Sequence, residues 1–208
     1  MQHRLNGWGA SEIYSVVSAR DKIPSVSIHK AFGVSKDISG LPDLRRGSIM
    51  EAPIISLFEQ RTGFRCEPWG DMIRNPTYPF LFATPDARCQ EWVVEIKCVK
   101  SFANWDTPAR MYQVQQQMLV SGAEQGMLVG LEMGDDYSML RGSWNQKALL
   151  MLAEEYMMER IVIGEDDSMR RAIAKHGAAQ WEVVERLRSA ADRGTLYRRC
   201  EEQQKEGP

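Results

Sequence analysis

Apolar residues recur at helical spacing in several parts of the chain. Between residues 45 and 62 they fall on one helical face, and Gly63 follows as a C-cap. Residues 108–122 repeat this pattern, with a proline near the start and a glycine at the end. Ser11 is expected to cap a short helix. Together the pattern predicts helices over residues 11–17, 45–62, 108–122, 146–161 and 168–193, the last with a break at Gly177.

Short runs rich in β-branched and aromatic residues lie between these helices. Three of them, separated by Gly, Asn and Pro, predict a meander of strands over residues 64–69, 80–83 and 92–99. Residues 127–133 are apolar enough for a central strand. Residues 135–142 are expected to add an edge strand.

The order of the predicted elements is helix, helix, strands, helix, strand, strand and helices. A surface connection over residues 21–44 joins the first two helices, because that stretch has no sustained periodicity. This order predicts an α/β or mixed α+β fold in which helices flank a central mixed sheet. With 208 residues, 43% of them hydrophobic, the chain suits a single domain over residues 1–208. We expect its core within residues 4–160, followed by C-terminal helices and a frayed polar tail within residues 165–208.

Composition changes this picture mainly by exclusion. The apolar stretches fall short of the roughly 20 residues that span a bilayer, and the opening MQHRLNGWGA lacks the apolar region of a secretory signal. We therefore expect a cytoplasmic protein without a membrane partner. The formal net charge is −2, yet the first 50 residues carry seven Lys and Arg against four acidic residues. That distribution is compatible with a local basic surface for nucleic acid.

The four cysteines show no pattern of a metal site or a disulfide framework. Cys66, Cys89, Cys98 and Cys200 form no CxxC pair and have no histidine at zinc-finger spacing. Their scatter also argues against an iron–sulfur cluster. We expect reduced structural thiols, and a hard cation as the only cofactor.

The segment LFATPDARCQEWVVEIKCVK carries the most informative chemistry. Glu95 and Lys97 lie two residues apart on a predicted strand, so both side chains leave the same face, where Asp86 can meet them. Two carboxylates and the backbone carbonyl of Ile96 form an oxygen site suited to Mg²⁺, with Mn²⁺ as a substitute and one or two ions per site. The metal would polarise a scissile phosphate. Lys97 would orient or deprotonate the attacking water, or stabilise charge in the transition state.

Two further side chains are expected to complete this site. Glu51, from the preceding helix, would add a carboxylate through a water molecule or a second metal ion. Gln113, on a later helix, would hydrogen-bond to the phosphate or the nucleophile. The alternative is a surface turn at Asp86 beside a solvated pair of charges. Against that alternative, Val93 and Val94 indicate a strand that is apolar on both faces, where unpartnered charges are unfavourable.

Five ordered segments have counterparts in a known nuclease family. An opening arginine and serine appear in RLNGWGASE as Arg4 and Ser11, and a helical glutamate appears in RRGSIMEAPIISLFEQRTG as Glu51. The family's S-P-D-G, E-L-K-C and A-Q-V-Q segments appear as TPDA, EIKC and YQVQQQM, although Ala87 replaces the glycine. Over its first two thirds, the chain therefore resembles the lambda exonuclease and YqaJ viral recombinase family of PD-(D/E)xK nucleases.

The resemblance implies a restriction-endonuclease-like core and a 5′-to-3′ exonuclease. Family members digest one strand of linear duplex DNA from a 5′-phosphorylated end to mononucleotides. They leave 3′ overhangs for phage-type recombination by strand annealing. The resemblance further implies a homotrimeric ring and a single-strand annealing protein as partner. Arg4 and Ser11 are expected to bind the terminal 5′-phosphate, and Trp8 and Arg45 to contact DNA.

Two other functions fit the same residues. An endonuclease or junction resolvase would use the same metal site without a 5′-phosphate pocket, so a change at Arg4 would leave its cleavage intact. A catalytically silent DNA-binding protein would keep the fold, but it would have no need of the carboxylate cluster at Asp86 and Glu95. Hydrolysis in Mg²⁺ that EDTA abolishes would dismiss this second alternative.

Overall fold

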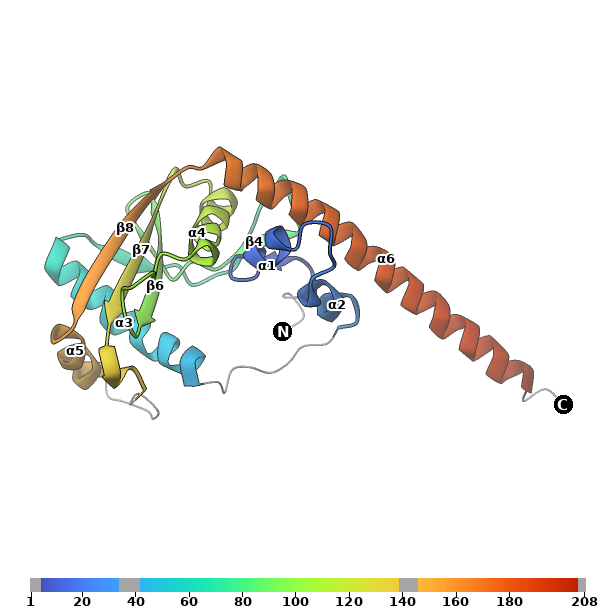
Figure 1. Ribbon diagram of the computed structural model, residues 1–208, viewed down its shortest axis with the longest axis horizontal. Coiled ribbons are helices and arrows are strands. Elements are labelled where there is room, and N and C mark those ends of the chain that lie inside the picture. The colour runs from blue at the N-terminus through green and yellow to red at the C-terminus, as the bar shows by residue number, and fades with distance from the viewer. Residues whose placement is uncertain (1–4, 34–41, 139–145, 206–208) are drawn as a thin grey trace.

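Two β-sheets surrounded by helices make up the described part of the chain, residues 5–33, 42–138 and 146–205 of the computed structural model (Figure 1). The larger sheet has five strands in the order β2-β5-β6-β7-β8, and the smaller sheet has three in the order β1-β4-β3. The predicted mixed α+β fold, with helices around a central mixed sheet, is confirmed. The strands are β1 (Trp8–Gly9), β2 (Cys66–Pro68), β3 (Ile73–Arg74), β4 (Leu81–Ala83), β5 (Ala87–Cys89), β6 (Trp92–Val99), β7 (Gln125–Glu132) and β8 (Met157–Gly164). The helices are α1 (Ile13–Ser18), α2 (Ser25–Ala31), α3 (Pro42–Thr62), α4 (Pro108–Ser121), α5 (Gln146–Glu154) and α6 (Asp167–Lys205), with a 3₁₀ helix over Gly134–Ser138.

The larger sheet is buried on both faces at its centre. Its strands β6 and β7 run parallel, whereas the other neighbouring strands are antiparallel. On one face Met50 of α3 shares an apolar cluster with Val94 of β6. On the other face Val114 of α4 shares a cluster with Val93. Because side chains alternate along a strand, Glu95 also faces α4.

Glycines of β7 let α4 lie close to this sheet. A Cβ at Gly126 would collide with Val114, and one at Gly130 would collide with Trp105. Glycine inside a strand is typical of places where another element approaches closely. The close approach brings the glutamines of α4 within reach of β6.

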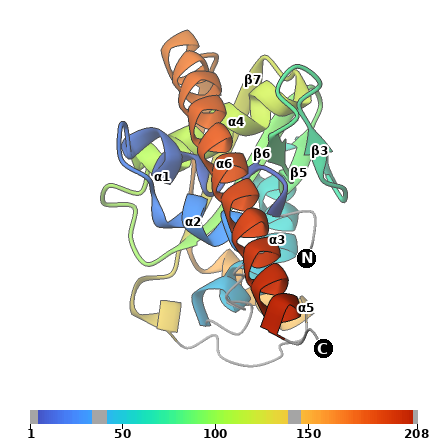
Figure 2. The ribbon, with the colours of Figure 1, turned by 90° about the vertical axis from the view of Figure 1, so that its right-hand side faces the viewer.

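The smaller sheet forms the other half of the folded molecule, together with the helices α1, α2 and α6. Trp8, Ile13, Leu81 and Ile173 are all buried there in one apolar cluster. Helix α6 crosses this half, and its C-terminal end runs away from the body (Figures 1 and 2). Among the residues that the structure describes, no helix is both long and apolar enough to cross a membrane.

The helices predicted over residues 45–62 and 108–122 are confirmed as α3 and α4, and the central strand as β7. The prediction that residues 64–69, 80–83 and 92–99 form a meander is wrong. Residues 80–83 form β4, which pairs with β1 and β3 in the smaller sheet, whereas β2, β5 and β6 are neighbours in the larger one. The prediction of a meander failed because the parallel partner of β4 comes from the far N-terminal segment.

The edge strand also lies elsewhere than predicted. Residues 135–138 belong to a 3₁₀ helix, and the rest of the predicted strand lies outside the described residues. An edge of the larger sheet is β8, which takes the last five residues of the helix predicted over residues 146–161. Antiparallel pairing of β8 with the apolar central strand β7 outweighs the helical periodicity of this segment.

Three helical details differ from the prediction. Helix α1 begins at Ile13, so Ser11 lies before its N-terminus and does not cap it. Residues 25–31, predicted as part of a connection, form α2. Helix α6 is unbroken at Gly177 and continues to Lys205, through most of the tail predicted to be frayed.

Candidate active site

Asp86, Glu95 and Lys97 come together beside β6, as predicted. Glu95 is buried, with 3% of its side chain exposed, and its Oε1 accepts a hydrogen bond from Lys97 Nζ. Asp86 Oδ2 accepts the N–H of Ile96 at 2.7 Å. The Asp86 N–H donates to the carbonyl of Val94 at 3.2 Å. The second carboxylate is therefore fastened to the strand that carries the first.

The carboxylates of this site disfavour one another's charge. The pKa of Asp86 is raised to about 8, first by burial and then by Glu95, against the lowering effects of the Ile96 N–H and of Lys97. The pKa of Glu51 on α3 is also raised, by burial first and Glu95 second. Glu51 thus lies in the electrostatic field of the pair, and its predicted contact through a water molecule or a second ion stays a prediction. Buried acids that repel one another favour a cation between them.

Helix α4 supplies two amide donors to Glu95. Gln113 Nε2 donates to Glu95 Oε1 at 2.7 Å, and Gln117 Nε2 donates to Oε2. Gln113 therefore belongs to the site, although its partner here is the carboxylate. Gln117 was missed by the sequence analysis. It is buried and follows Gln113 by four residues, and that spacing, which places two side chains on one helical face, is the signal that could have found it.

The donor set suits a hard cation better than zinc. Within the described ranges, no three His, Cys, Asp or Glu side chains are grouped to hold a metal ion by themselves. Asp86 and Glu95 would supply two carboxylates, and the other positions would fall to backbone oxygen, water and substrate. Mg²⁺ accepts such a mixture. Glu51 fits a contact through water better than one as a third direct ligand.

The described cysteines are free thiols that do not belong to this donor set. Cys66, Cys89 and Cys98 carry free thiols, while the side chain of Cys200 lies outside the described residues. Burial is the main reason that the pKa values of Cys66 and Cys98 rise to about 12. Such thiols are poor nucleophiles near neutral pH.

The predicted DNA contacts lie mostly in the N-terminal segment. Arg4 lies outside the described residues, as does the side chain of Arg45. Ser11 is exposed in the turn between β1 and α1. Trp8 is fully buried, and its Nε1 donates to the carbonyl of Gly177 at 2.9 Å. The predicted contact of Trp8 with DNA is therefore wrong, because its ring belongs to the apolar core.

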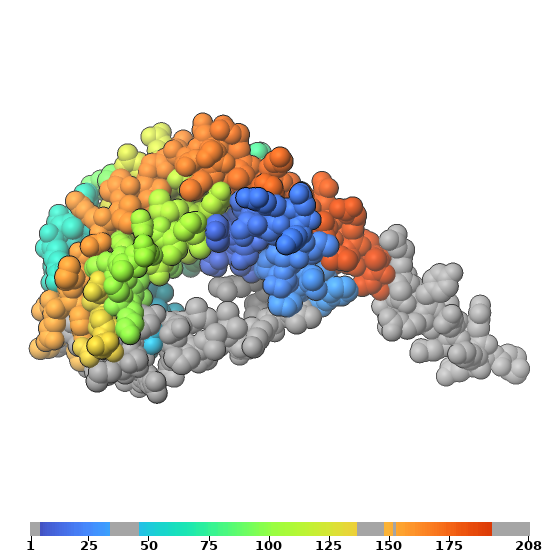
Figure 3. Space-filling model, viewed as in Figure 1, coloured from blue at the N-terminus to red at the C-terminus, as the bar shows by residue number. Residues whose placement is uncertain are grey.

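Helix α4 joins the N-terminal segment to the carboxylate site. Gln116, between the two glutamines that bind Glu95, donates to the carbonyls of Trp8 at 2.8 Å and Phe82 at 2.9 Å. In the space-filling view the atoms of α1, α2 and α4 border a hollow (Figure 3). The two predicted sites thus share one helix as their common support.

Solved exonuclease structures share this fold. The alkaline exonuclease LHK-Exo of Laribacter hongkongensis is similar with a TM-score of 0.68 and 19% identity, over 94% of this chain and 96% of that chain. LHK-Exo in complex with dAMP gives a TM-score of 0.67 and 20% identity over the same shares. A phage-related exonuclease of Haemophilus somnus 129PT gives 0.69 and 13%, over 89% of this chain and 96% of that chain. At these identities the likeness establishes the fold alone.

No curated protein sequence matches the chain. The model of the YqaJ-like viral recombinase domain matches residues 1–124, which is more than half of the 208 residues. The matched part contains all the predicted site residues and ends just before β7. The resemblance first found in the short motifs is confirmed, and the chain belongs to the family of YqaJ-like viral recombinase domains.

Proposed function

We propose that this protein is a Mg²⁺-dependent exonuclease that degrades one strand of linear duplex DNA from a 5′-phosphorylated end. The observation that carries the proposal is the convergence of Asp86, Glu95 and Lys97 at one largely buried site. The family and the exonuclease names of the similar structures support the reaction class. The dAMP complex of LHK-Exo supports mononucleotides as products.

In this proposal Asp86, Glu95 and the backbone carbonyl of Ile96 would hold the ion, and Glu51 would act through a water molecule. Bound Mg²⁺ would supply the positive charge that polarises the scissile phosphate. Asp86 would contribute its carboxylate, which the Ile96 N–H orients through Oδ2. Glu95 would contribute its carboxylate, and Gln117 fixes the orientation of that group through Oε2.

Lys97 acts on the attacking water or on the phosphate. The ammonium of Lys97 is paired with Glu95, and its side chain is 27% exposed, so it reaches solvent as well as the buried carboxylate. The N–H donors of Lys97 would bond to the attacking water or to a phosphate oxygen. A fixed cation at that position stabilises the charge that develops in the transition state.

The proposal extends to assembly, partner and location. We propose a homotrimeric ring around the duplex, in the cytoplasm of a bacterial or phage-infected cell, and 3′ overhangs that pass to a single-strand annealing protein. The C-terminal end of α6 runs away from the body and is the proposed contact for that protein (Figure 1). Co-purification that survives deletion of residues 193–208 would contradict this placement. A monomeric mass in light scattering would contradict the ring.

The test is digestion of a linear duplex in Mg²⁺, with 5′-phosphate and 5′-hydroxyl ends compared beside a closed circular duplex. Mononucleotide release from the phosphorylated linear duplex is expected, and EDTA or Lys97→Ala should abolish it. Cutting of the circle would indicate an endonuclease instead. If no duplex is cut, the chain is a DNA-binding protein without catalytic activity.

A further inference from the structure

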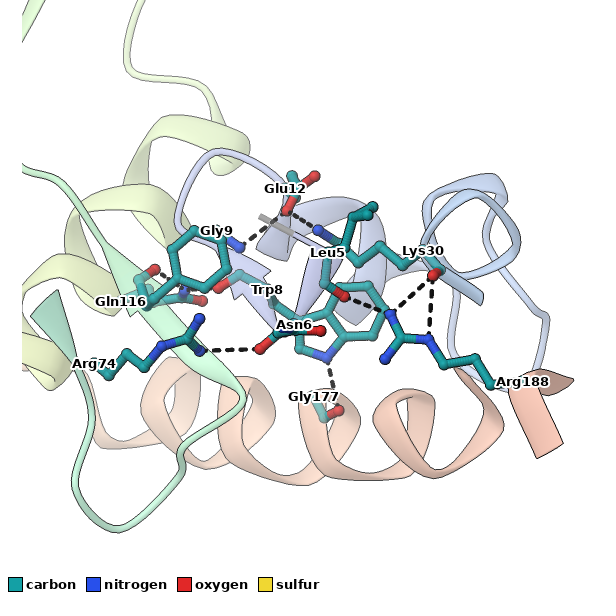
Figure 4. Close-up of polar contacts among 11 residues, drawn as sticks. Leu5, Asn6, Trp8, Gly9, Glu12, Lys30, Arg74, Gln116, Gly177 and Arg188 are labelled. Atoms are coloured by element: carbon teal, nitrogen blue, oxygen red, sulfur yellow. Dashed lines mark hydrogen bonds and ion pairs between the residues drawn. The ribbon is translucent and has the colours of Figure 1, made fainter. Parts of the chain in front are cut away.

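Helix α6 lies against the segment that carries the proposed 5′-phosphate residues. We refer to residues 5–12 as the end-binding segment, since Arg4 precedes it and Ser11 lies within it. Trp8 of this segment donates its Nε1–H to the Gly177 carbonyl of α6, as Figure 4 shows. The segment is therefore held by a helix that lies beyond the part matched by the family model.

Arg188 of α6 fixes the start of the end-binding segment. Its Nη2 donates to the carbonyl of Leu5 at 2.6 Å and to that of Lys30 at 2.9 Å (Figure 4). The guanidinium also lies over the Trp181 ring, 5.2 Å from its centroid. A planar guanidinium suits this task, because its several donors bridge two carbonyls in a fixed geometry. Leu5 directly follows Arg4, so Arg188 fixes the backbone beside the proposed phosphate ligand.

Lys30 of α2 fixes the other end of the segment. Its Nζ lies 2.9 Å from Glu12 Oε2, and the same oxygen accepts the N–H of Gly9 at 2.9 Å. Lys30 is only 4% exposed, and its ammonium lies over the Trp8 ring, 5.5 Å from the centroid. Because Arg188 holds the backbone of Lys30 as well, the two ends of the segment are tied to each other.

The segment also has a fixed position relative to the carboxylates. Gln116 of α4 holds the Trp8 carbonyl, and the next residue, Gln117, holds Glu95. Movement of the segment would therefore change its distance from the site where the phosphodiester is cut.

We propose that Arg188 and Lys30 are positioning residues for recognition of the DNA end: they hold the end-binding segment, which contains the proposed 5′-phosphate ligand Ser11, at a fixed place. This inference rests on the proposed function and adds α6 to the parts that read the end. Neither Arg188 nor Lys30 needs to touch DNA. Their contribution is the geometry of the pocket, which decides the preference for a phosphorylated end.

The experiment compares Arg188→Ala with Arg186→Ala. Arg186 is an exposed residue of the same helix whose described hydrogen bond goes to Glu182 of α6 itself. Initial rates are measured on full-length protein with 5′-phosphate and 5′-hydroxyl duplexes, and thermal unfolding checks the fold. For Arg188→Ala we expect KM for phosphorylated ends to rise roughly ten- to a hundredfold, with kcat and the rates on hydroxyl ends nearly unchanged. Arg188→Lys should recover part of the loss, and Arg186→Ala should behave as the unchanged protein.

Each outcome has one meaning. A folded Arg188→Ala protein that keeps its preference for phosphate would overturn the inference, and so would equal losses on both kinds of end, which a purely structural role predicts. If Arg188→Ala does not fold, Glu12→Gln serves instead, because it removes the charge that pairs with Lys30 and keeps an acceptor for the Gly9 N–H. Retained preference in Glu12→Gln would then overturn the inference, and reduced preference would support it. If the unchanged protein digests both ends equally, the proposed end recognition fails before α6 is tested.

Discussion

The carboxylate site and the end-binding segment are built in opposite ways. Glu95 is bonded by Lys97 and Gln117, which are 2 and 22 positions away in the chain. Leu5 in the end-binding segment is bonded by Arg188, 183 positions away. The side chains that bond Glu95 come from its own strand and from the helix that follows it. The second exists only when the two distant parts of the chain are in contact.

This difference implies that chemistry and end recognition can be separated by mutation. A strand and a helix joined by a short connection hold their side chains rigidly, so changes elsewhere should leave hydrolysis itself intact. The end-binding segment has only two residues of regular pairing, Trp8 and Gly9 with β4. Its position therefore depends on hydrogen bonds to α2, α4 and α6.

The largest expected effect tests the carboxylate site alone. Asp86→Asn keeps an acceptor for the Ile96 N–H but removes a charge that the ion requires, so hydrolysis should fall roughly 10³-fold on both kinds of DNA end. The ratio between phosphorylated and hydroxyl ends in single-turnover assays should stay the same. Glu67→Gln, at an exposed carboxylate of β2, is the matched control and should keep full activity. A changed ratio in Asp86→Asn would show that the two regions are not separable.

A second pair of variants compares two buried glutamines of α4. Gln117→Leu removes a donor to Glu95 and should lower kcat about ten- to a hundredfold, because the carboxylate loses its fixed orientation. Gln115→Leu removes a bond to the Gly164 carbonyl and should lower the melting temperature with little change in kcat. Steady-state rates and thermal unfolding of both proteins test this contrast. Equal kcat values for Gln117→Leu and Gln115→Leu would show that Gln117 has no specific role in the reaction.

A smaller effect is expected at the contact between α6 and β1. A Cβ at Gly177 would lie 3.1 Å from Phe80 and 3.6 Å from Trp8, so Gly177→Ala should push α6 slightly outward. Helix propensity favours alanine by about 1 kcal/mol, which offsets much of the crowding, so stability should change little. The preference for phosphorylated ends should nevertheless fall several-fold in the rate assay. An unchanged preference would mean that Trp8 tolerates this displacement.

The smallest effect concerns pH and the start of α6. The pKa of Asp166 is lowered by the Ser168 hydroxyl first and then by the Met169 N–H, both of which donate to its carboxylate. A carboxyl whose pKa is lowered by folding stabilises the fold above its ordinary value of 3.8 and loses that contribution as the pH falls further. Asp166→Ala should therefore lower the melting temperature at pH 7 but less at pH 3. A difference that is the same at both pH values would contradict this assignment.

The features that could be predicted from the sequence are those that depend on residues close together in the chain. Glu95 and Lys97 share a face because they are two apart on a strand, and that rule needs no knowledge of the fold. Gln113 followed from a motif, whereas Gln117 would have followed from helical spacing. Burial of Trp8 was not predictable, because it depends on α6, whose contact with Trp8 spans 169 positions. The strand β8 was mistaken for helix for the same reason, since its partner β7 decides its conformation.

The contact between Arg188 and Leu5 also sets an order of events during synthesis. Residues 86–117 can assemble soon after α4 is made. The carbonyl of Leu5, in contrast, gains its bond from Arg188 only after 183 further residues have been added. At ~5–20 residues per second, that interval is on the order of ten to forty seconds. A nascent chain therefore acquires its hydrolytic residues well before it acquires the support for its end-binding segment. In the proposed function, the preference for phosphorylated ends would therefore be acquired after the carboxylate site has formed.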